Sequence, residues 1–235
     1  MKKPYLSGLR DGLPIGLAYL CVSFGFGILA TQGGLSTLEA AVTSAVNLTS
    51  AGQTAAIGII AAGGTLFEMF LTQLVINLRY SLMGLSLSQK LAPGFSVGHR
   101  LLASFGITDE IFALMIRSPE PVTPRYMYGA THVSVVGWIL GTFLGASAGS
   151  ALPASLLGAM GILLYSMFIA IIVPPAKESR PVLFSVLIAV AVSVFLYYVF
   201  PAVSSGFSVI ISAVGASLLI AWLRPLPDEE EEVRA

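Results

Sequence analysis

Long stretches without a charged residue alternate with short polar stretches along this chain. No Asp, Glu, Lys or Arg occurs in 12–38, 40–67, 126–176 or 181–223. A helix that spans a bilayer needs about 20 mostly apolar residues, so each of the last two stretches has room for two such helices. The stretches are apolar on all sides, whereas a transmembrane barrel requires strands of alternating polarity. The pattern therefore predicts an all-α fold, a polytopic membrane helix bundle.

Eight apolar segments are expected in this bundle, and several of them are bounded by proline or by charged residues. They are 13–31, 38–61, 64–87, 98–117, 126–150, 153–174, 181–199 and 203–223. Either all eight segments cross the membrane, or 38–61 and 98–117 are broken or re-entrant and six segments cross fully. The sequence thus predicts six to eight membrane segments, with breaks in 38–61 and 98–117.

The distribution of basic residues predicts the orientation, because short loops rich in Lys and Arg stay in the cytoplasm. Basic residues precede the first segment, lie in the 117–125 and 174–181 loops, and follow the last segment, whereas loops near 32–37, 151–153 and 200–204 have none. Both termini are therefore predicted to be cytoplasmic. Lys90, His99 and Arg100 place their loop on the same side, which favours the broken form of 38–61 and 98–117.

Composition narrows the function classes further. Hydrophobic residues make up 56% of the chain and charged residues 10%, against about 25% charged residues in soluble domains. The net charge is zero, so there is no electrostatic basis for binding nucleic acid, and the single Cys21 excludes an internal disulfide and a multi-cysteine metal site. We expect no metal, a single transmembrane domain over 1–223, and an acidic, disordered cytoplasmic tail over 224–235.

Two stripes of glycine predict close contacts between helices. Glycine recurs every four residues at Gly8, Gly12 and Gly16, and again at Gly137, Gly141, Gly145 and Gly149. Small residues at this spacing let helix backbones approach each other in lipid. The partner is either a helix of the same bundle or a moving or separate helix.

Residues 145–149 of the second stripe also match the G-x-S-x-G nucleophile elbow. That motif requires a strand before the serine, and this one lies inside a predicted helix. We therefore expect no enzyme activity.

Polar residues within the apolar segments mark the candidate site, because ionisable groups inside a bilayer are costly and usually functional. Asn47, Ser50 and Gln53 surround Gly52, where the helix can unwind. At about 100° per residue, the next helix carries one polar stripe with Glu68 and Arg79 and another with Gln73 and Asn77. Arg79 either offers a fork of donors to a carboxylate or extends to the membrane interface. Glu68 either binds a proton or has a structural partner.

The segment from Ser104 to Met115 carries two adjacent carboxylates. Gly106 can end a helix, and Thr108 is a favourable N-cap for a new one. Asp109 and Glu110 would lie in its first turn, where the helix dipole stabilises negative charge. If this turn lies within the bilayer, binding of an amine or a proton explains the carboxylates better, since interrupted helices build the sites of many secondary transporters.

These arguments assign two groups of candidate residues. The predicted substrate-binding residues are Asn47, Ser50, Gln53, Asn77, Arg79 and Thr108. The predicted proton-coupling or amine-binding residues are Glu68, Asp109 and Glu110.

A series of short motifs resembles the AzlC family, the large subunit of branched-chain amino-acid exporters. The motifs are Leu13-Pro14-Ile15-Gly16, a small-polar segment ending in Gln53, Asn77-Leu78-Arg79, Thr108-Asp109-Glu110, and Tyr128-Gly129 followed by Trp138. The resemblance extends to about residue 220. It implies a multi-pass protein of the bacterial cytoplasmic (inner) membrane that exports leucine, isoleucine, valine or methionine. It also implies a small AzlD-type membrane subunit, a proton-motive-force-driven secondary mechanism and no cofactor, and the chain has no G-x-x-x-x-G-K-[ST] nucleotide motif.

One segment departs from the family pattern. The family usually reads Ala-Gly-Ser-Ala-Gln-Phe where this chain has Thr49-Ser50-Ala51-Gly52-Gln53-Thr54. If this segment touches the substrate side chain, a more polar or differently shaped substrate is expected. The alternatives to export are a channel or carrier for another small solute, or a membrane scaffold subunit that transports nothing itself.

Overall fold

A computed structural model describes residues 4–148 and 152–223 of the chain, and the regular structure of these residues is helical apart from one isolated bridge between Leu91 and Val122. The helices are α1 (Pro4–Gln32), α2 (Thr37–Val46), α3 (Ser50–Ala61), α4 (Leu66–Ser88), α5 (Val97–Ser104), α6 (Asp109–Arg117), α7 (Pro124–Ala148), α8 (Ala154–Glu178), α9 (Arg180–Val199) and α10 (Ser205–Leu223). The predicted all-α fold is confirmed. The predicted acidic tail and Gly149 lie outside the described residues.

The chain forms two compact units. The first comprises 1–57 and 76–167, and the second comprises 58–75 and 168–235. The single transmembrane domain expected from the sequence stays a prediction. Each unit is described separately below.

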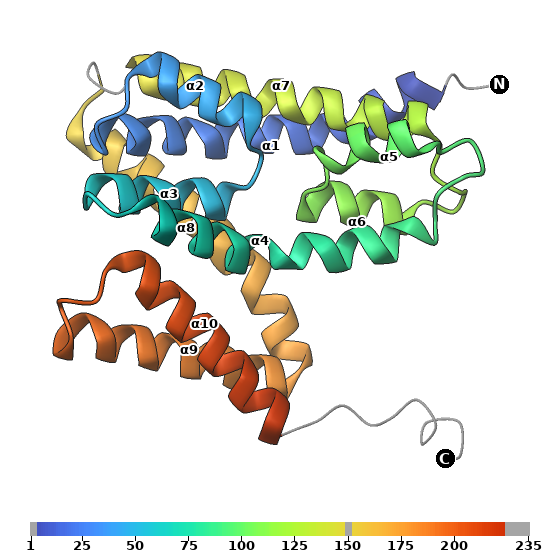
Figure 1. The fold of residues 1–235 in the computed structure, drawn as a ribbon. Helices are drawn as coiled ribbons and strands as arrows, with labels where there is room; N and C mark the ends of the chain where they lie inside the picture. The colour runs from blue at the N-terminus through green and yellow to red at the C-terminus, as the bar shows by residue number, and fades with distance from the viewer. Residues whose placement is uncertain (1–3, 149–151, 224–235) are drawn as a thin grey trace. The chain divides into compact units, whose positions relative to one another are not determined.

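Helices α1 and α7 pack side by side along their length in the first unit (Figure 1). The two glycine stripes meet in this contact: Gly8 and Gly12 lie against the backbone of Tyr126 and Ala130. A Cβ atom on Gly137 would overlap the carbonyl oxygen of Gly16, and those on other α7 glycines would overlap α1 carbonyls in the same way. The predicted close approach is confirmed, and its partner is a helix of the same bundle.

Two helices extend further than the apolar pattern predicts. α1 begins at Pro4 rather than near residue 13, with Pro14 inside the helix. The contacts of its early glycines with α7 favour the helix there, and a proline at the helix start leaves no donor unpaired. In the same way α8 continues through Pro174 and Pro175 to Glu178.

A hydrophobic cluster in the first unit positions α5 and α6. It comprises Leu87, Phe95, Ala103, Ile111, Met115, Val122, Met127 and Ala130. The loop between α4 and α5 is joined to the loop between α6 and α7 by two backbone hydrogen bonds. Ala92 N–H donates to the Val122 carbonyl at 2.9 Å, and Val122 N–H donates to the Lys90 carbonyl at 2.9 Å. The Lys90 ammonium donates to the Ile116 carbonyl at 2.8 Å, which ties α6 to the same loops.

The segments 38–61 and 98–117 are each divided into two helices. The first is interrupted at residues 47–49 and the second at 105–108. Side chains supply the caps: Ser36 and Glu39 form a capping box at α2, and the Thr108 hydroxyl accepts from Ile111 N–H at α6. The Ser36 N–H and hydroxyl both donate to the Glu39 carboxylate at 2.7 Å. The second interruption includes Gly106, as the sequence predicts. The first lies at 47–49 and not at Gly52, which is inside α3 because the Thr49 hydroxyl accepts from its N–H and caps the helix before it. A re-entrant course of both segments stays a prediction.

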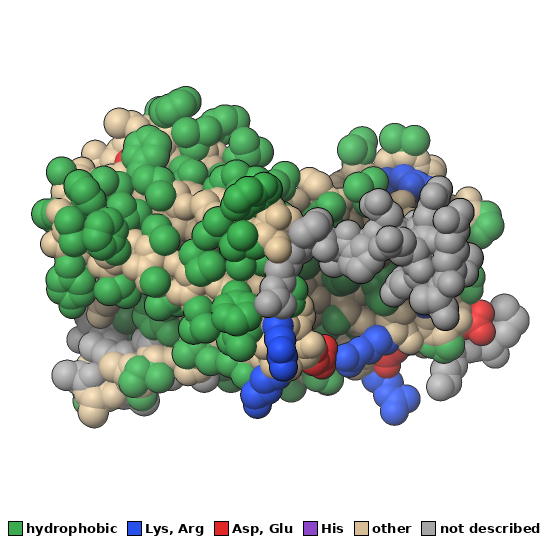
Figure 2. All heavy atoms as spheres, turned by 90° about the horizontal axis from the view of Figure 1, so that it is seen from below, with side chains coloured by type: hydrophobic (Ala, Val, Ile, Leu, Met, Phe, Trp, Pro, Cys, Tyr) green, Lys and Arg blue, Asp and Glu red, His purple; other side chains and the backbone are tan. Residues whose placement is uncertain are grey.

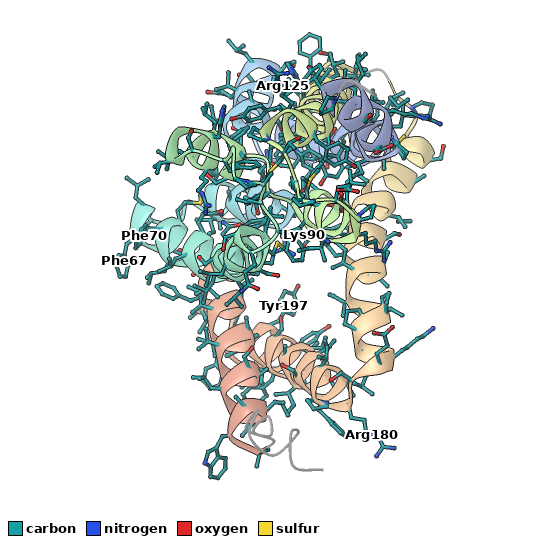
Figure 3. All side chains as sticks on the ribbon, turned by 90° about the vertical axis from the view of Figure 1, so that its right-hand side faces the viewer. Phe67, Phe70, Lys90, Arg125, Arg180 and Tyr197 are labelled. Carbon is teal, nitrogen blue, oxygen red and sulfur yellow. The ribbon has the colours of Figure 1, made fainter. Side chains whose placement is uncertain are left out.

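Four helices in the described part of the chain are long and apolar enough to cross a membrane, namely α1, α7, α9 and α10. Hydrophobic side chains cover much of the face seen in Figure 2. Phe67 and Phe70 of α4 point away from their helix (Figure 3) and are 64% and 62% exposed. Exposed apolar surface of this extent is typical of contact with lipid. The count of six to eight membrane segments stays a prediction.

The contact between α1 and α7 gives a first test. Gly137→Ala places a methyl group against the carbonyl oxygen of Gly16, and rigid backbone on both sides prevents local relief. We expect the free energy of unfolding to fall by about 1–3 kcal/mol, measured by thermal unfolding of the purified chain in detergent. The matched control is Gly158→Ala in α8, where a Cβ atom meets nothing within 4 Å. Equal stability of the two variants would contradict this packing.

Candidate functional site

The interruption between α2 and α3 is held by short polar side chains. Asn47 ends α2 in an extended conformation, with φ −146° and ψ 113°, and its Oδ1 accepts from Thr49 N–H at 3.2 Å. The Thr49 hydroxyl accepts from Gly52 N–H at 3.3 Å at the start of α3. The same hydroxyl donates to Asn77 Oδ1 at 2.7 Å. Asn77, on α4, is therefore tied directly to the interruption.

Gln53 lies fully buried behind this interruption and has partners at both ends of its amide. Its Nε2 donates to Ser44 Oγ at 3.1 Å, and its Oε1 accepts from Trp138 Nε1 at 3.0 Å. Thr142 Oγ1 donates to the Trp138 carbonyl at 3.0 Å, so its hydroxyl proton is already used. Ser44 must then donate to Thr142 across their 2.7 Å contact. Gln53 thus fastens α3 to α2 and α7, and its predicted contact with substrate stays a prediction.

An ion pair joins α4 to the start of α6. Arg79 Nη1 lies 2.7 Å from Asp109 Oδ2, and the two side chains are 35% and 24% exposed. Arg79 Nη2 donates to the Tyr80 hydroxyl at 3.3 Å, and its guanidinium stacks 5.0 Å from the centre of the Tyr80 ring. Asp109 is the first residue of α6, where the helix dipole also stabilises its negative charge. Arg79 is therefore directed to a carboxylate within the protein.

The second carboxylate of this turn has a different partner. The Tyr19 hydroxyl on α1 lies 2.7 Å from Thr108 Oγ1 and 2.5 Å from Glu110 Oε2. A phenol has one proton, so it can donate to only one of them. When Glu110 is ionised, Tyr19 donates to the carboxylate and the Thr108 hydroxyl donates to the Tyr19 oxygen. Thr108, Tyr19 and Glu110 then form one continuous hydrogen-bonded chain.

Two hollows lie beside these groups in the first unit. We call the larger one the amphiphilic pocket; its volume is about 210 Å³ and it is lined by Val46, Asn47, Leu48, Thr49, Asn77, Tyr80, Ser104, Phe105 and Ile107. We call the smaller one the polar cavity; its volume is about 10 Å³ and it is lined by Tyr19, Leu48, Ser50, Tyr80, Thr108, Asp109, Glu110 and Trp138. The polar cavity has room for about one water molecule. Leu48 and Tyr80 line both, so they form the wall between them.

The structure therefore brings most of the predicted residues of the first unit to one place. Asn47 and Asn77 line the amphiphilic pocket. Ser50, Thr108, Asp109 and Glu110 line the polar cavity, Arg79 pairs with one of these carboxylates, and Gln53 lies behind. Among the described residues, no cluster of three or more His, Cys, Asp or Glu side chains is suited to hold a metal ion.

Two tyrosines of the site are absent from the sequence-based assignment. Tyr80 directly follows Arg79, and an aromatic residue beside a membrane-embedded arginine is a signal that sequence reasoning can use. Tyr19 lies in an uncharged run and is 89 positions from Thr108 in the chain. No local pattern connects them, so only the packing of α1 identifies Tyr19.

Glu68 belongs to the second unit and is 4% exposed. It accepts hydrogen bonds from Gly206 N–H at 3.0 Å and from the Ser204 hydroxyl, which places the carboxylate at the N-terminus of α10. Thr72, one turn further along α4, is fully buried, and its hydroxyl has no partner among the described residues. Glu68 therefore anchors α10 to α4, and its predicted part in proton coupling stays a prediction.

The buried amide of Gln53 gives a second test. Trp138→Phe removes the indole N–H and leaves Gln53 Oε1 without that donor. We expect the free energy of unfolding to fall by about 1–3 kcal/mol, the cost of an unsatisfied buried polar group. Circular dichroism during thermal unfolding measures the change. Trp222→Phe is the matched control because Trp222 is 79% exposed, and a similar loss in both variants would contradict the role of this hydrogen bond.

Comparison with known proteins places these elements in a family. The model of the AzlC protein family matches residues 14–152, which include the residues of both hollows. The chain is 29% identical to the inner membrane protein YgaZ of Escherichia coli K12 over 234 residues, covering 96% of this chain and 94% of that protein. It is 31% identical over 175 residues to an uncharacterized membrane protein of Archaeoglobus fulgidus, covering 74% and 76% of the two chains.

No solved structure matches the chain. The family model nevertheless covers more than half of the sequence, including the interrupted helices and the part of the α1–α7 contact from residue 14 onward. The resemblance noted from the sequence motifs is confirmed: the chain belongs to the AzlC family of membrane proteins, which is associated with branched-chain amino acid transport.

Proposed function

We propose that this protein is the large subunit of a two-component secondary transporter that exports small hydrophobic, branched-chain amino acids. The observation that carries the proposal is the Arg79–Asp109 ion pair at the interrupted helices, beside a pocket with both polar and apolar walls. Such a site matches a zwitterion with an apolar side chain. Membership of a transporter family rather than an enzyme family agrees with it.

The walls of the amphiphilic pocket divide by chemistry. Asn47, Thr49 and Asn77 supply hydrogen-bonding groups, whereas Val46, Phe105 and Ile107 supply apolar surface. An interrupted helix exposes backbone groups that a substrate can satisfy, as in many secondary transporters. In the proposed complex the amino-acid head group faces the polar side and the aliphatic side chain faces the apolar side.

The ion pair supplies the two charges that a zwitterion requires. Arg79 offers a planar fork of donors to the substrate carboxylate, and Asp109 accepts the substrate ammonium. Without substrate the two residues neutralise each other at 2.7 Å. Bound substrate then replaces one internal ion pair by two, so neither charge is left unpaired inside the membrane.

Proton coupling is assigned mainly to Glu110. Asp109 has a guanidinium partner at 2.7 Å, whereas the partner of Glu110 is a neutral phenol. A proton on Glu110 therefore leaves no cation unpaired. Tyr19 and Thr108 provide a hydrogen-bonded route to it, and the adjoining polar cavity has room for one water. Movement of the Leu48–Tyr80 wall would connect substrate and proton sites during alternating access.

The proposed localisation, small subunit and absence of a cofactor are inferred from membership of the family. The relative from Escherichia coli is named an inner membrane protein, and we assign this chain to the cytoplasmic (inner) membrane of a bacterium, with both termini in the cytoplasm. It works with a small AzlD-type membrane subunit and without a cofactor. The interrupted segments 38–61 and 98–117 are assigned a re-entrant course near the site.

Retention of amino acids in cells tests the proposal. Leucine, valine and methionine are measured inside cells that lack or overproduce the chain, with and without the small subunit. The cells are first loaded with a dipeptide that contains the amino acid to be measured. We then expect overproduction to lower, and deletion to raise, the intracellular level of at least one of the three amino acids. Levels that do not respond to the chain in any combination would refute export.

The carboxylates at the start of α6 give a sharper test. Asp109→Asn combined with Glu110→Gln keeps side-chain size but removes both charges, so we expect uphill export of leucine to be abolished. Glu110→Gln alone should retain downhill leucine movement while losing its response to the proton gradient, because Asp109 still pairs with Arg79. Leucine flux from loaded vesicles with and without an imposed pH gradient measures both. Full uphill export by the double variant would exclude the carboxylate role.

Glu68 is the second coupling candidate because it is buried. Glu68→Gln preserves an acceptor for Gly206 N–H but cannot bind or release a proton. We expect uphill leucine export to fall while the unfolding temperature stays within a few degrees of the wild type. A fully active Glu68→Gln variant would confine coupling to Asp109 and Glu110.

A further inference from the structure

A third hollow adjoins the amphiphilic pocket in the first unit. Its volume is about 180 Å³, and we call it the vestibule. Its lining includes Gly84, Leu87, Phe95, Arg100, Ser104 and Ile107. Ser104 and Ile107 also line the amphiphilic pocket, so the two spaces share a wall at the interruption between α5 and α6. The vestibule, the amphiphilic pocket and the polar cavity thus follow one another with shared lining residues.

The vestibule combines an apolar lining with one charged side chain. Two of the three basic groups near it are engaged: the Lys90 ammonium donates to the Ile116 carbonyl at 2.8 Å, and His99 Nδ1 lies 2.8 Å from the Tyr128 hydroxyl. Arg100 donates only through Nε, to the Phe95 carbonyl at 3.5 Å. Its two Nη atoms hydrogen-bond to no residue that the structure describes. A guanidinium with both terminal nitrogens open is suited to bind a carboxylate.

We propose that the vestibule is a separate loading site for the amino-acid substrate, at which Arg100 binds the substrate carboxylate and the apolar lining holds the substrate side chain. The inference rests on the proposed export function and adds a step before binding at Arg79 and Asp109. Charge complementarity supports this occupant, and so does the wall shared with the amphiphilic pocket. The basic residues around it place it on the side from which an exporter takes its substrate.

A loading site changes how export depends on substrate concentration. Arg100 is exposed, so its pairing with a carboxylate is screened and moderate in strength. Substrate binding for transport and proton coupling remain at Arg79, Asp109 and Glu110, which do not line the vestibule. Loss of the vestibule should therefore raise the intracellular leucine concentration for half-maximal export and leave the maximal rate unchanged.

Two variants test the two halves of the site in vesicles that contain the full chain and its small subunit. Arg100→Gln removes the charge, and we expect the half-saturating leucine concentration to rise about twofold to fivefold, with partial recovery in Arg100→Lys. Gly84→Leu fills the apolar half, and a Cβ atom at Gly84 meets nothing within 4 Å, so the helix accepts it. Here the half-saturating concentration should rise more for leucine than for alanine.

The controls are Arg180→Gln and Gly215→Leu, since Arg180 and Gly215 lie in the second unit and a Cβ atom at Gly215 also meets nothing within 4 Å. Protein in the membrane is quantified for every variant. Wild-type half-saturation in either Arg100→Gln or Gly84→Leu overturns the loading site, as does a lower maximal rate at unchanged half-saturation. If the wild-type chain itself moves no leucine, the export function fails, and the occupant assigned to the vestibule fails with it.

Discussion

Helices α1 and α7 touch backbone to backbone through two facing stripes of glycine, and the first unit is arranged around that contact. A methyl group at Gly137 would already overlap the carbonyl oxygen of Gly16. The close approach brings Tyr19 of α1 and Trp138 of α7 together, with ring centres 5.3 Å apart. Each of these residues then holds one interrupted segment: Trp138 binds Gln53 of α3, and Tyr19 binds Thr108 at the start of α6.

An interrupted helix leaves polar backbone groups unpaired, and it also provides helix ends that can stabilise charged side chains. A break leaves backbone groups unpaired, and in lipid these must be satisfied within the protein. Thr49 and Thr108 satisfy part of them with their hydroxyls. The N-terminus of α6 also stabilises the carboxylates at its start, and Arg79 neutralises Asp109. Arg79 and Asp109 thereby place one positive and one negative charge side by side at the interruption. In the proposed function these two charges bind the carboxylate and the ammonium of the substrate.

The second unit uses the same chemistry for a different contact. The carboxylate of Glu68 receives hydrogen bonds from the N-terminal turn of α10, just as Asp109 and Glu110 lie at the N-terminus of α6. In both places a buried or half-buried acid is stabilised by a helix end rather than left in an apolar environment. The difference lies in the partners, because Asp109 has a guanidinium within 2.7 Å and Glu68 has hydroxyl and amide donors.

Local pattern was sufficient for the helical type of the elements and for the types of residue at the site, but not for all helix ends. Uncharged runs determined the helical membrane fold, glycine spacing determined that two helices approach closely, and Gly106 and the Thr108 cap determined the second interruption, because each of these depends on residues near in sequence. The first interruption lies at 47–49 rather than at Gly52, which is inside α3. Tertiary structure alone decided that the two glycine stripes are partners and that Gln53 binds Trp138. It also placed Tyr19 beside Glu110 and extended α1 past Pro14 to Pro4. These features depend on contacts between residues far apart in the chain, which no local periodicity encodes.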